Sequence, residues 1–108
     1  MINYDGRRFQ PTGHGPDAPI TTYRQDGDLL WADLFGGAVR RGALCGRCDG
    51  DGVLDFTYSM VLNDGRVIAG HCRSTPEMLA DGRVRLHEAW ERYGPHAEAG
   101  VGELEEVR

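Results

Sequence analysis

The chain contains no lysine, because all 12 of its basic residues are arginine. Without a lysine amine it cannot form a Schiff base with a carbonyl substrate or with pyridoxal phosphate, and it lacks the lysine of a P-loop. Positive charge is also scarce, since 17 acidic residues leave a net charge of -5 at pH 7. Nucleic-acid binding depends on clustered positive charge, so we expect no nucleic-acid partner.

Long apolar runs are absent as well. The longest unbroken one, Leu29–Ala32, is far shorter than the roughly 20 residues of a membrane-spanning helix. Residues 1–8 lack the apolar region of a secretory signal peptide. Three cysteines, an odd number, are typical of reduced thiols. We therefore expect a cytoplasmic protein that does not contact membranes.

The 108 residues suffice for one domain, predicted over 1–108. Asp-Gly and Gly-Gly pairs recur along the chain and tolerate the positive φ angles of tight hairpin turns. The segments between them have strand length, and residues 54–62 alternate apolar with polar, the period of a half-buried strand. Strands are predicted near 4–10, 20–25, 28–35, 38–48, 53–62, 66–74, 83–92 and 100–107, with loops at 11–19 and 94–99.

This pattern predicts an all-β fold, an antiparallel up-and-down meander that closes into a small lipocalin-like barrel or half-barrel. Two segments leave a helical alternative open. Thr75-Pro76-Glu77 resembles a helix start, with a capping hydroxyl and a proline in the first turn. Residues 84–93 also fit one helix face, with Glu88 and Arg92 as an i,i+4 pair.

The turns also predict which side chains point into the barrel, because turn length fixes strand register. If Asp64-Gly65 is a two-residue turn, Leu62 lies opposite Val67, and the same reasoning extends through the other hairpins. The predicted interior then contains polar groups among the apolar ones: Tyr23, Arg41, Tyr58, His71 and Arg73. They predict either a pocket with a cationic floor, for a small molecule bearing a carboxylate or carbonyl, or arginines that pair with acidic neighbours near strand ends.

If 83–92 is a strand, Leu86, Glu88 and Trp90 share its apolar face, which places Glu88 inside. A carboxyl that loses water there has a raised pKa, so Glu88 is the predicted acid–base or ligand-orienting group. His71 is the next catalytic candidate, as a proton partner near neutral pH. Trp90 joins the predicted ligand-binding set. In the helical alternative, Glu88 is a solvated residue paired with Arg92.

Cysteine spacing raises the question of a metal. Cys45-Gly46-Arg47-Cys48 with the later Cys72 resembles part of a zinc site. The predicted register points Cys45 inward and the other two outward, so they cannot converge on one ion. We therefore expect no metal site and no cofactor.

The face opposite the predicted interior carries Leu29, Trp31, Phe35 and Leu44. A stripe of that size is unusual on the surface of a monomer. It predicts a homodimer that buries Trp31, or else a surface covered by an N-terminal segment.

Three stretches of the chain carry a resemblance to a known group. These are Tyr23–Leu29, Gly36–Gly42, and Cys72–Glu77 taken together with Arg85–Trp90. With them the chain resembles short bacterial proteins often labelled N-acetylglutamate synthase. The resemblance implies a compact antiparallel β fold similar to lipocalin-like barrels and favours a strand at 83–92. This sequence departs from the group's pattern at Cys45 and Cys48.

The label implies acetyl transfer, and Gln10–Gly15 matches the acetyl-CoA pyrophosphate loop of such enzymes in its letters. Pro16 and Pro19 follow, however, and preclude the helix that this loop must open. The leading hypothesis is instead a small-molecule-binding barrel. The alternatives are an enzyme that isomerises or cyclises a small metabolite on the same barrel, and a structural, self-associating domain.

Overall fold

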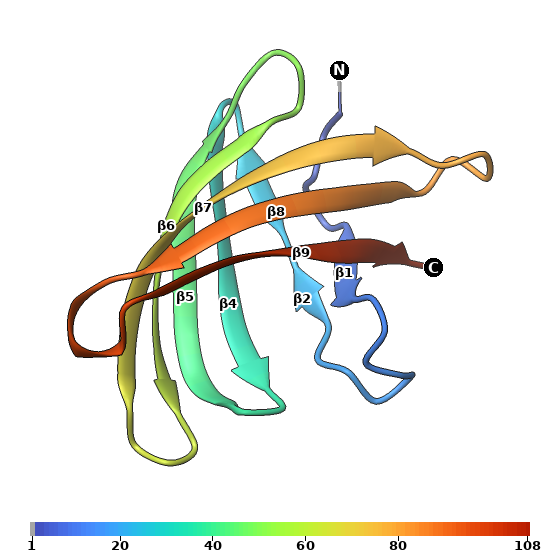
Figure 1. Cartoon of the computed structure of the whole chain (residues 1–108). Coiled ribbons are helices and arrows are strands. Elements are labelled where there is room, and N and C mark those ends of the chain that lie inside the picture. The colour runs from blue at the N-terminus through green and yellow to red at the C-terminus, as the bar shows by residue number, and fades with distance from the viewer. Residues whose placement is uncertain (1) are drawn as a thin grey trace.

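The computed structural model describes residues 2–108, which form nine β-strands and one short 3₁₀ helix joined by loops (Figure 1). The strands are β1 (Arg8–Pro11), β2 (Thr21–Thr22), β3 (Arg24–Asp26), β4 (Leu29–Gly36), β5 (Val39–Cys48), β6 (Leu54–Leu62), β7 (Val67–Met78), β8 (Val84–Arg92) and β9 (Glu98–Val107). The 3₁₀ helix η1 (Gly94–His96) joins β8 to β9. Within residues 2–108, the structure has no helix with the length and apolarity that a membrane crossing requires.

All nine strands form one sheet in the order β2-β1-β9-β8-β7-β6-β5-β4-β3, and the paired neighbours are antiparallel. The prediction of an all-β antiparallel meander is confirmed. Figure 1 shows the sheet curling around a central space.

The stretch 21–26 nearly closes this sheet into a barrel. Its first half, β2, pairs with β1, and its second half, β3, pairs with β4 at the other edge. At the break between them, the Tyr23 N–H donates to the Arg7 carbonyl at 2.9 Å, and the Gly6 N–H donates to the Tyr23 carbonyl at 2.8 Å. A barrel of about eight strands leaves an interior that side chains fill or that holds one small ligand.

Three successive hairpins share one loop design. The loops 50–52, 63–65 and 80–82 each have three residues and end in a glycine with positive φ, at 79°, 90° and 87° respectively. In the second and third, the backbone N–H groups of Arg66 and Arg83 donate to the aspartate two residues earlier, each at 3.0 Å. This is the turn-plus-bulge hairpin in which the last loop residue is left-handed.

The predicted two-residue turn at Asp64-Gly65 is therefore wrong. Asn63 belongs to the loop, so Val61 pairs with Val67 and Met60 with Ile68. One extra loop residue shifts the register by one position and turns every side chain of β7 to the other face of the sheet.

Several strand limits also differ from prediction. β1 begins at Arg8 instead of near residue 4, and the predicted strand 20–25 is divided into β2 and β3. β7 continues through 75–77, where a helical turn was predicted. Pro76 is tolerated there because β6 stops pairing with β7 at Ser74, so no ladder bond to β6 is lost. β8 is a strand, which makes the helical alternative for 84–93 wrong. β9 begins at Glu98, inside the predicted 94–99 loop.

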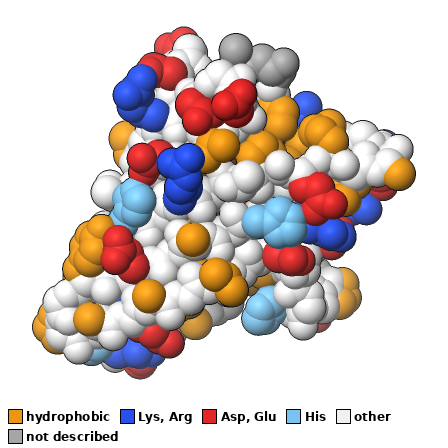
Figure 2. Space-filling model, turned by 45° about the horizontal axis from the view of Figure 1, so that its top comes forward, with side chains coloured by type: hydrophobic (Ala, Val, Ile, Leu, Met, Phe, Trp, Pro, Cys, Tyr) orange, Lys and Arg blue, Asp and Glu red, His pale blue; other side chains and the backbone are white. Residues whose placement is uncertain are grey.

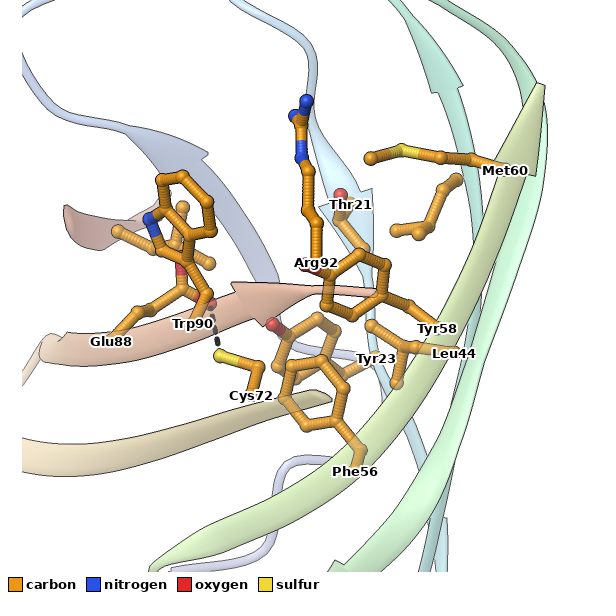
Figure 3. A pocket seen from close by; sticks show the side chains of 12 residues that line it. Thr21, Tyr23, Leu44, Phe56, Tyr58, Met60, Cys72, Glu88, Trp90 and Arg92 are labelled. Carbon is orange, nitrogen blue, oxygen red and sulfur yellow. Dashed lines mark hydrogen bonds between the residues drawn. The ribbon is translucent and has the colours of Figure 1, made fainter. Parts of the chain in front are cut away.

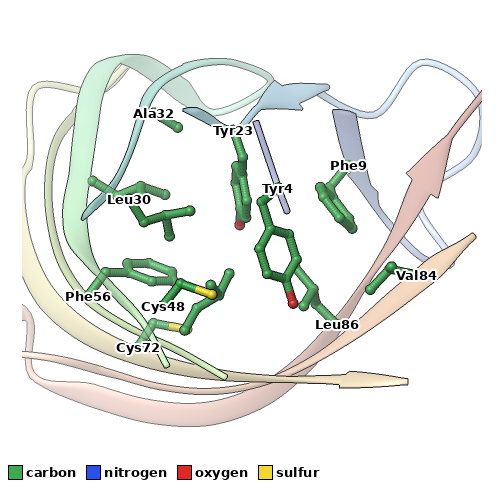
Figure 4. Close-up of a cluster of buried hydrophobic side chains, with 12 residues drawn as sticks. Tyr4, Phe9, Tyr23, Leu30, Ala32, Cys48, Phe56, Cys72, Val84 and Leu86 are labelled. Carbon is green, nitrogen blue, oxygen red and sulfur yellow. The ribbon is translucent and has the colours of Figure 1, made fainter. Parts of the chain in front are cut away.

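The core fills the end of the barrel near the chain termini (Figure 4). Tyr4, Phe9 and Tyr23 are almost completely buried and pack with ring centroids 5.1–6.3 Å apart. The Tyr4 hydroxyl donates to the Gly52 carbonyl at 2.6 Å, and the Gln25 side chain accepts from the Tyr4 N–H at 2.9 Å. The N-terminal segment therefore plugs this end and leaves the other end for a cavity.

The outer face of β7, β8 and β9 is mixed, with Arg73, His87 and Glu103 beside the exposed Val67 and Val101. Figure 2 shows hydrophobic side chains among acidic, basic and histidine ones in one view of the surface. His87 lies between Glu77, at 2.8 Å, and Glu103, at 3.5 Å. On β4, three large apolar side chains are exposed, as predicted: Leu29, Trp31 and Phe35. Leu44 is buried inside the barrel, so its predicted place in this stripe is wrong.

Candidate functional site

A cavity of about 260 Å³ occupies the half of the barrel that the core leaves free (Figure 3). Its walls come from almost every long strand of the sheet. They are formed by Thr21, Tyr23, Leu34, Leu44, Phe56, Tyr58, Met60, Cys72, Glu88, Trp90, Arg92 and Leu104. The volume lies just below the roughly 300–1,000 Å³ of typical ligand pockets, so the cavity suits a small occupant.

Glu88 on β8 is the acidic side chain of this cavity. Its Oε2 accepts long hydrogen bonds from the Cys72 thiol, at 3.5 Å, and from the Ser74 hydroxyl, at 3.4 Å. Burial raises the pKa of Glu88 above its ordinary value of 4.5, and the two hydrogen bonds only partly oppose that effect. The carboxyl is therefore suited to orient a ligand or to exchange a proton with it.

The thiol and phenol beside Glu88 also have raised pKa values. Burial and the nearby Glu88 raise the pKa of the Cys72 thiol to about 12, so this thiol is not a nucleophile at neutral pH. The Tyr23 hydroxyl is fully buried, and burial, followed by the charge of Glu88, raises its pKa as well. The Ser74 hydroxyl, the Cys72 thiol and the Glu88 carboxyl thus form a hydrogen-bonded polar floor in an apolar setting.

Large side chains line the walls because glycines lie opposite them on the neighbouring strands. The directly opposed pairs are Phe56–Gly46, Met60–Gly42, Tyr58–Gly70 and Trp90–Gly100. A Cβ at Gly100 would lie 2.7 Å from the Trp90 ring, and a Cβ at Gly70 would collide with the Tyr58 ring. Gly70 and Gly100 therefore give the two rings room to lie along the wall, whereas a Cβ at Gly42 or Gly46 would collide with the backbone and Cβ of the opposed strand.

Arg92 is the basic side chain of the cavity and lies four residues beyond Glu88 on the same face of β8. Its guanidinium carbon is 5.5 Å from the centroid of the Trp90 ring, a cation–π contact, and Glu98 is 4.0 Å away. Figure 3 shows the guanidinium pointing away from the Glu88–Cys72 contact. The cavity therefore has an acidic side chain toward one end and a basic side chain toward the other.

The structure places four of the predicted site residues in this cavity: Tyr23, Tyr58, Glu88 and Trp90. The other three lie elsewhere, because the hairpin loops shift the strand register by one residue from the predicted one. His71 and Arg73 on β7 and Arg41 on β5 lie on the outer face, so their predicted inward orientation is wrong. His71 contacts Asp55 and Glu91 there. The predicted cationic floor is replaced by the acidic Glu88.

The cysteines change faces for the same reason. Cys72 and Cys48 are buried and Cys45 is exposed, the reverse of the prediction for each. Arg92, Thr21, Leu34 and Met60 were not assigned to the site from the sequence, although Arg92 follows Glu88 and Trp90 at the two-residue spacing of one strand face.

Fold and cavity together define a class: an antiparallel up-and-down β-barrel with a ligand-sized internal pocket. The family model for avidin-like proteins matches residues 2–107, and the chain belongs to this family. No curated protein and no solved structure gives a significant match.

This small-barrel family binds small molecules, which agrees with an internal pocket. The match fits the predicted resemblance to small β-barrel proteins, whereas it gives no support to the N-acetylglutamate synthase label.

Proposed function

We propose that this protein binds one small molecule inside the barrel, with the apolar part of the ligand among Phe56, Tyr58 and Trp90. The observation that carries the proposal is a pocket of about 260 Å³ in which a polar floor meets aromatic walls, with the Tyr58 and Trp90 rings lying over opposed glycines. Mostly apolar pockets with a few convergent polar groups are the usual form of small-molecule sites. Membership of a ligand-binding barrel family supports the same function.

A second candidate is an enzyme that isomerises or cyclises the bound molecule. The specific observation in its favour is Glu88, a half-buried carboxyl with a raised pKa at the wall of the cavity. Binding protein and enzyme differ in whether the molecule leaves unchanged, which product analysis by mass spectrometry distinguishes.

We also expect this function in a reducing compartment such as the cytoplasm. All three cysteines are free thiols, and one of them, Cys72, contacts Glu88 in the pocket. A net charge of -5 repels the phosphates of nucleic acid, so we propose no nucleic-acid partner.

Native mass spectrometry of freshly purified protein tests the proposal. The chain is incubated with a filtered small-molecule extract of cells, next to a Leu34→Trp variant whose larger side chain narrows the pocket. The expected result is an added small mass on the wild type that is absent from the folded variant. A bare wild-type chain, or equal added mass on both chains, would contradict binding in this cavity.

A further inference from the structure

Among the described residues 2–108, those lining the cavity include one acidic side chain, Glu88, and one basic side chain, Arg92. They lie on one strand, on one face and four residues apart, so their Cα atoms are separated by roughly 13 Å along β8. Trp90 lies between them on the same face. The strand thus presents a negative group, an aromatic surface and a positive group in line.

Neither charge is neutralised by a close partner within the cavity. The described partners of Glu88 are a thiol and a hydroxyl, at 3.5 and 3.4 Å. Arg92 contacts Glu98 at the 4.0 Å limit of an ion pair, lies over Trp90, and has the neutral Tyr58 hydroxyl beside it. A half-buried carboxylate without a cation is unfavourable, so a ligand cation beside Glu88 would supply what the protein lacks.

The surroundings of Glu88 suit a cation in a second way. Tyr23, Phe56 and Trp90 line the same cavity, and aromatic faces attract ammonium groups through their quadrupole. The other titratable groups that face Glu88 are Cys72, Tyr23 and Tyr58, all of which have pKa values raised by burial and stay neutral. A ligand ammonium would therefore meet no competing positive charge at this end.

We propose that the ligand is a small zwitterion, with an ammonium group at Glu88, an apolar spacer along Trp90 and a carboxylate at Arg92. This inference rests on the proposed function and specifies its ligand class. Charge-assisted hydrogen bonds at both ends would fix the direction of the molecule in the barrel.

Binding is measured by isothermal titration with straight-chain ω-amino acids, from ω-aminobutanoic to ω-aminooctanoic acid. Matched probes remove one charge at a time: N-acetyl-ω-aminohexanoic acid lacks the cation, and hexylamine lacks the carboxylate. We expect the ω-amino acids to bind best, with an optimum inside the series because the two charged side chains are a fixed distance apart. Equal affinity for the acetylated probe would overturn the proposal.

Variants then assign each end. Glu88→Gln should weaken binding of the best ω-amino acid about 10- to 100-fold while leaving hexanoic acid unaffected, since a charge-assisted bond contributes about 1.5–3 kcal/mol. Arg92→Gln should weaken the amino acid and hexanoic acid but not hexylamine. Asp33→Asn and Arg41→Gln remove the same charges from exposed outer-face positions and should change neither affinity. If a control variant weakens binding as much as Glu88→Gln or Arg92→Gln does, the assignment is overturned.

The two proposals fail differently. If the molecule captured from the cell extract binds in the pocket but no ω-amino acid does, the ligand class is wrong and the binding function stands. If nothing is captured and no probe binds, the binding function itself is wrong.

Discussion

At the scale of single residues, the pocket depends on glycines that face large side chains. Gly100 lies opposite Trp90 and its Cβ position is occupied by the indole, whereas Gly102 lies opposite Glu88 with no atom within 4 Å of its Cβ position. The two positions are two residues apart on one strand face, so they form a matched pair.

Gly100→Ala should force Trp90 to move, lowering the free energy of unfolding by about 1–3 kcal/mol, as for other overpacked interiors. Gly102→Ala should be neutral or stabilising by up to about 1 kcal/mol, because alanine lowers the entropy of the unfolded chain. Urea unfolding of both variants checks this. Equal stability would show that the indole does not rest on Gly100.

Glu88 gives a prediction for pH. Its pKa in the folded protein is raised above 4.5, so the folded state holds the proton more tightly than the unfolded chain does. Wild-type stability is then lost as pH rises from about 4.5 through the folded pKa. Glu88→Gln should be more stable than wild type at neutral pH, with a difference that shrinks as pH falls and vanishes in acid below the ordinary pKa.

Urea unfolding at a series of pH values measures this difference, and exposed Asp33→Asn is the control. If instead Glu88→Gln is less stable than wild type at neutral pH, the carboxylate is charged and paired in the folded protein. In that case the loss would be about 3 kcal/mol, typical of a broken buried pair.

At the scale of elements, hairpin loop length decides which residues reach the site. The alternation at 54–62 and 84–90 identified the inward side chains of β6 and β8, including Glu88 and Trp90, because each strand reports its own apolar face. The prediction was wrong for Arg41, His71 and Arg73, because their orientation was calculated from the assumed length of a hairpin loop and not from the pattern of their own strand. An Asp-Gly pair fits a two-residue loop and the end of a three-residue loop equally well, and the choice reverses the next strand.

The loop 50–52 tests this loop design. Gly52 has a φ of 79° and its Cβ position is crowded by Ile2 and Pro76, whereas Gly50 has neither constraint. Gly52→Ala should lower the free energy of unfolding by about 1–2 kcal/mol, the usual cost of a left-handed non-glycine residue. Gly50→Ala should change it little. Thermal unfolding of the two variants measures these changes. A similar loss of stability in both variants would contradict a left-handed conformation specific to Gly52.

At the scale of the whole molecule, turn spacing and strand period were enough to predict the barrel from the sequence. They were not enough to predict how the barrel closes. The stretch 21–26 pairs with two different strands around Tyr23, and no local pattern announces that a short segment will join two edges. The cavity was equally hidden, because it results from glycines and large side chains that meet only when distant strands pair.

The exposed stripe on β4 predicts assembly. Leu29, Trp31 and Phe35 have exposed fractions of 45%, 39% and 61%, and we expect a homodimer that covers them. Trp31→Glu should give a folded monomer in sedimentation analysis, since a carboxylate in an apolar interface is strongly unfavourable. A wild-type monomer, or a dimer that the substitution leaves intact, would contradict this interface.

Ligand binding inside the barrel is tested most directly by the two tryptophans, one in the cavity and one outside it. In a Trp31→Phe chain all indole fluorescence comes from Trp90, and in a Trp90→Phe chain all of it comes from Trp31. Both chains are titrated with the molecule captured in native mass spectrometry. A saturable change in Trp90 emission with constant Trp31 emission is the predicted result, whereas a response of Trp31 with none from Trp90 would contradict binding in the cavity.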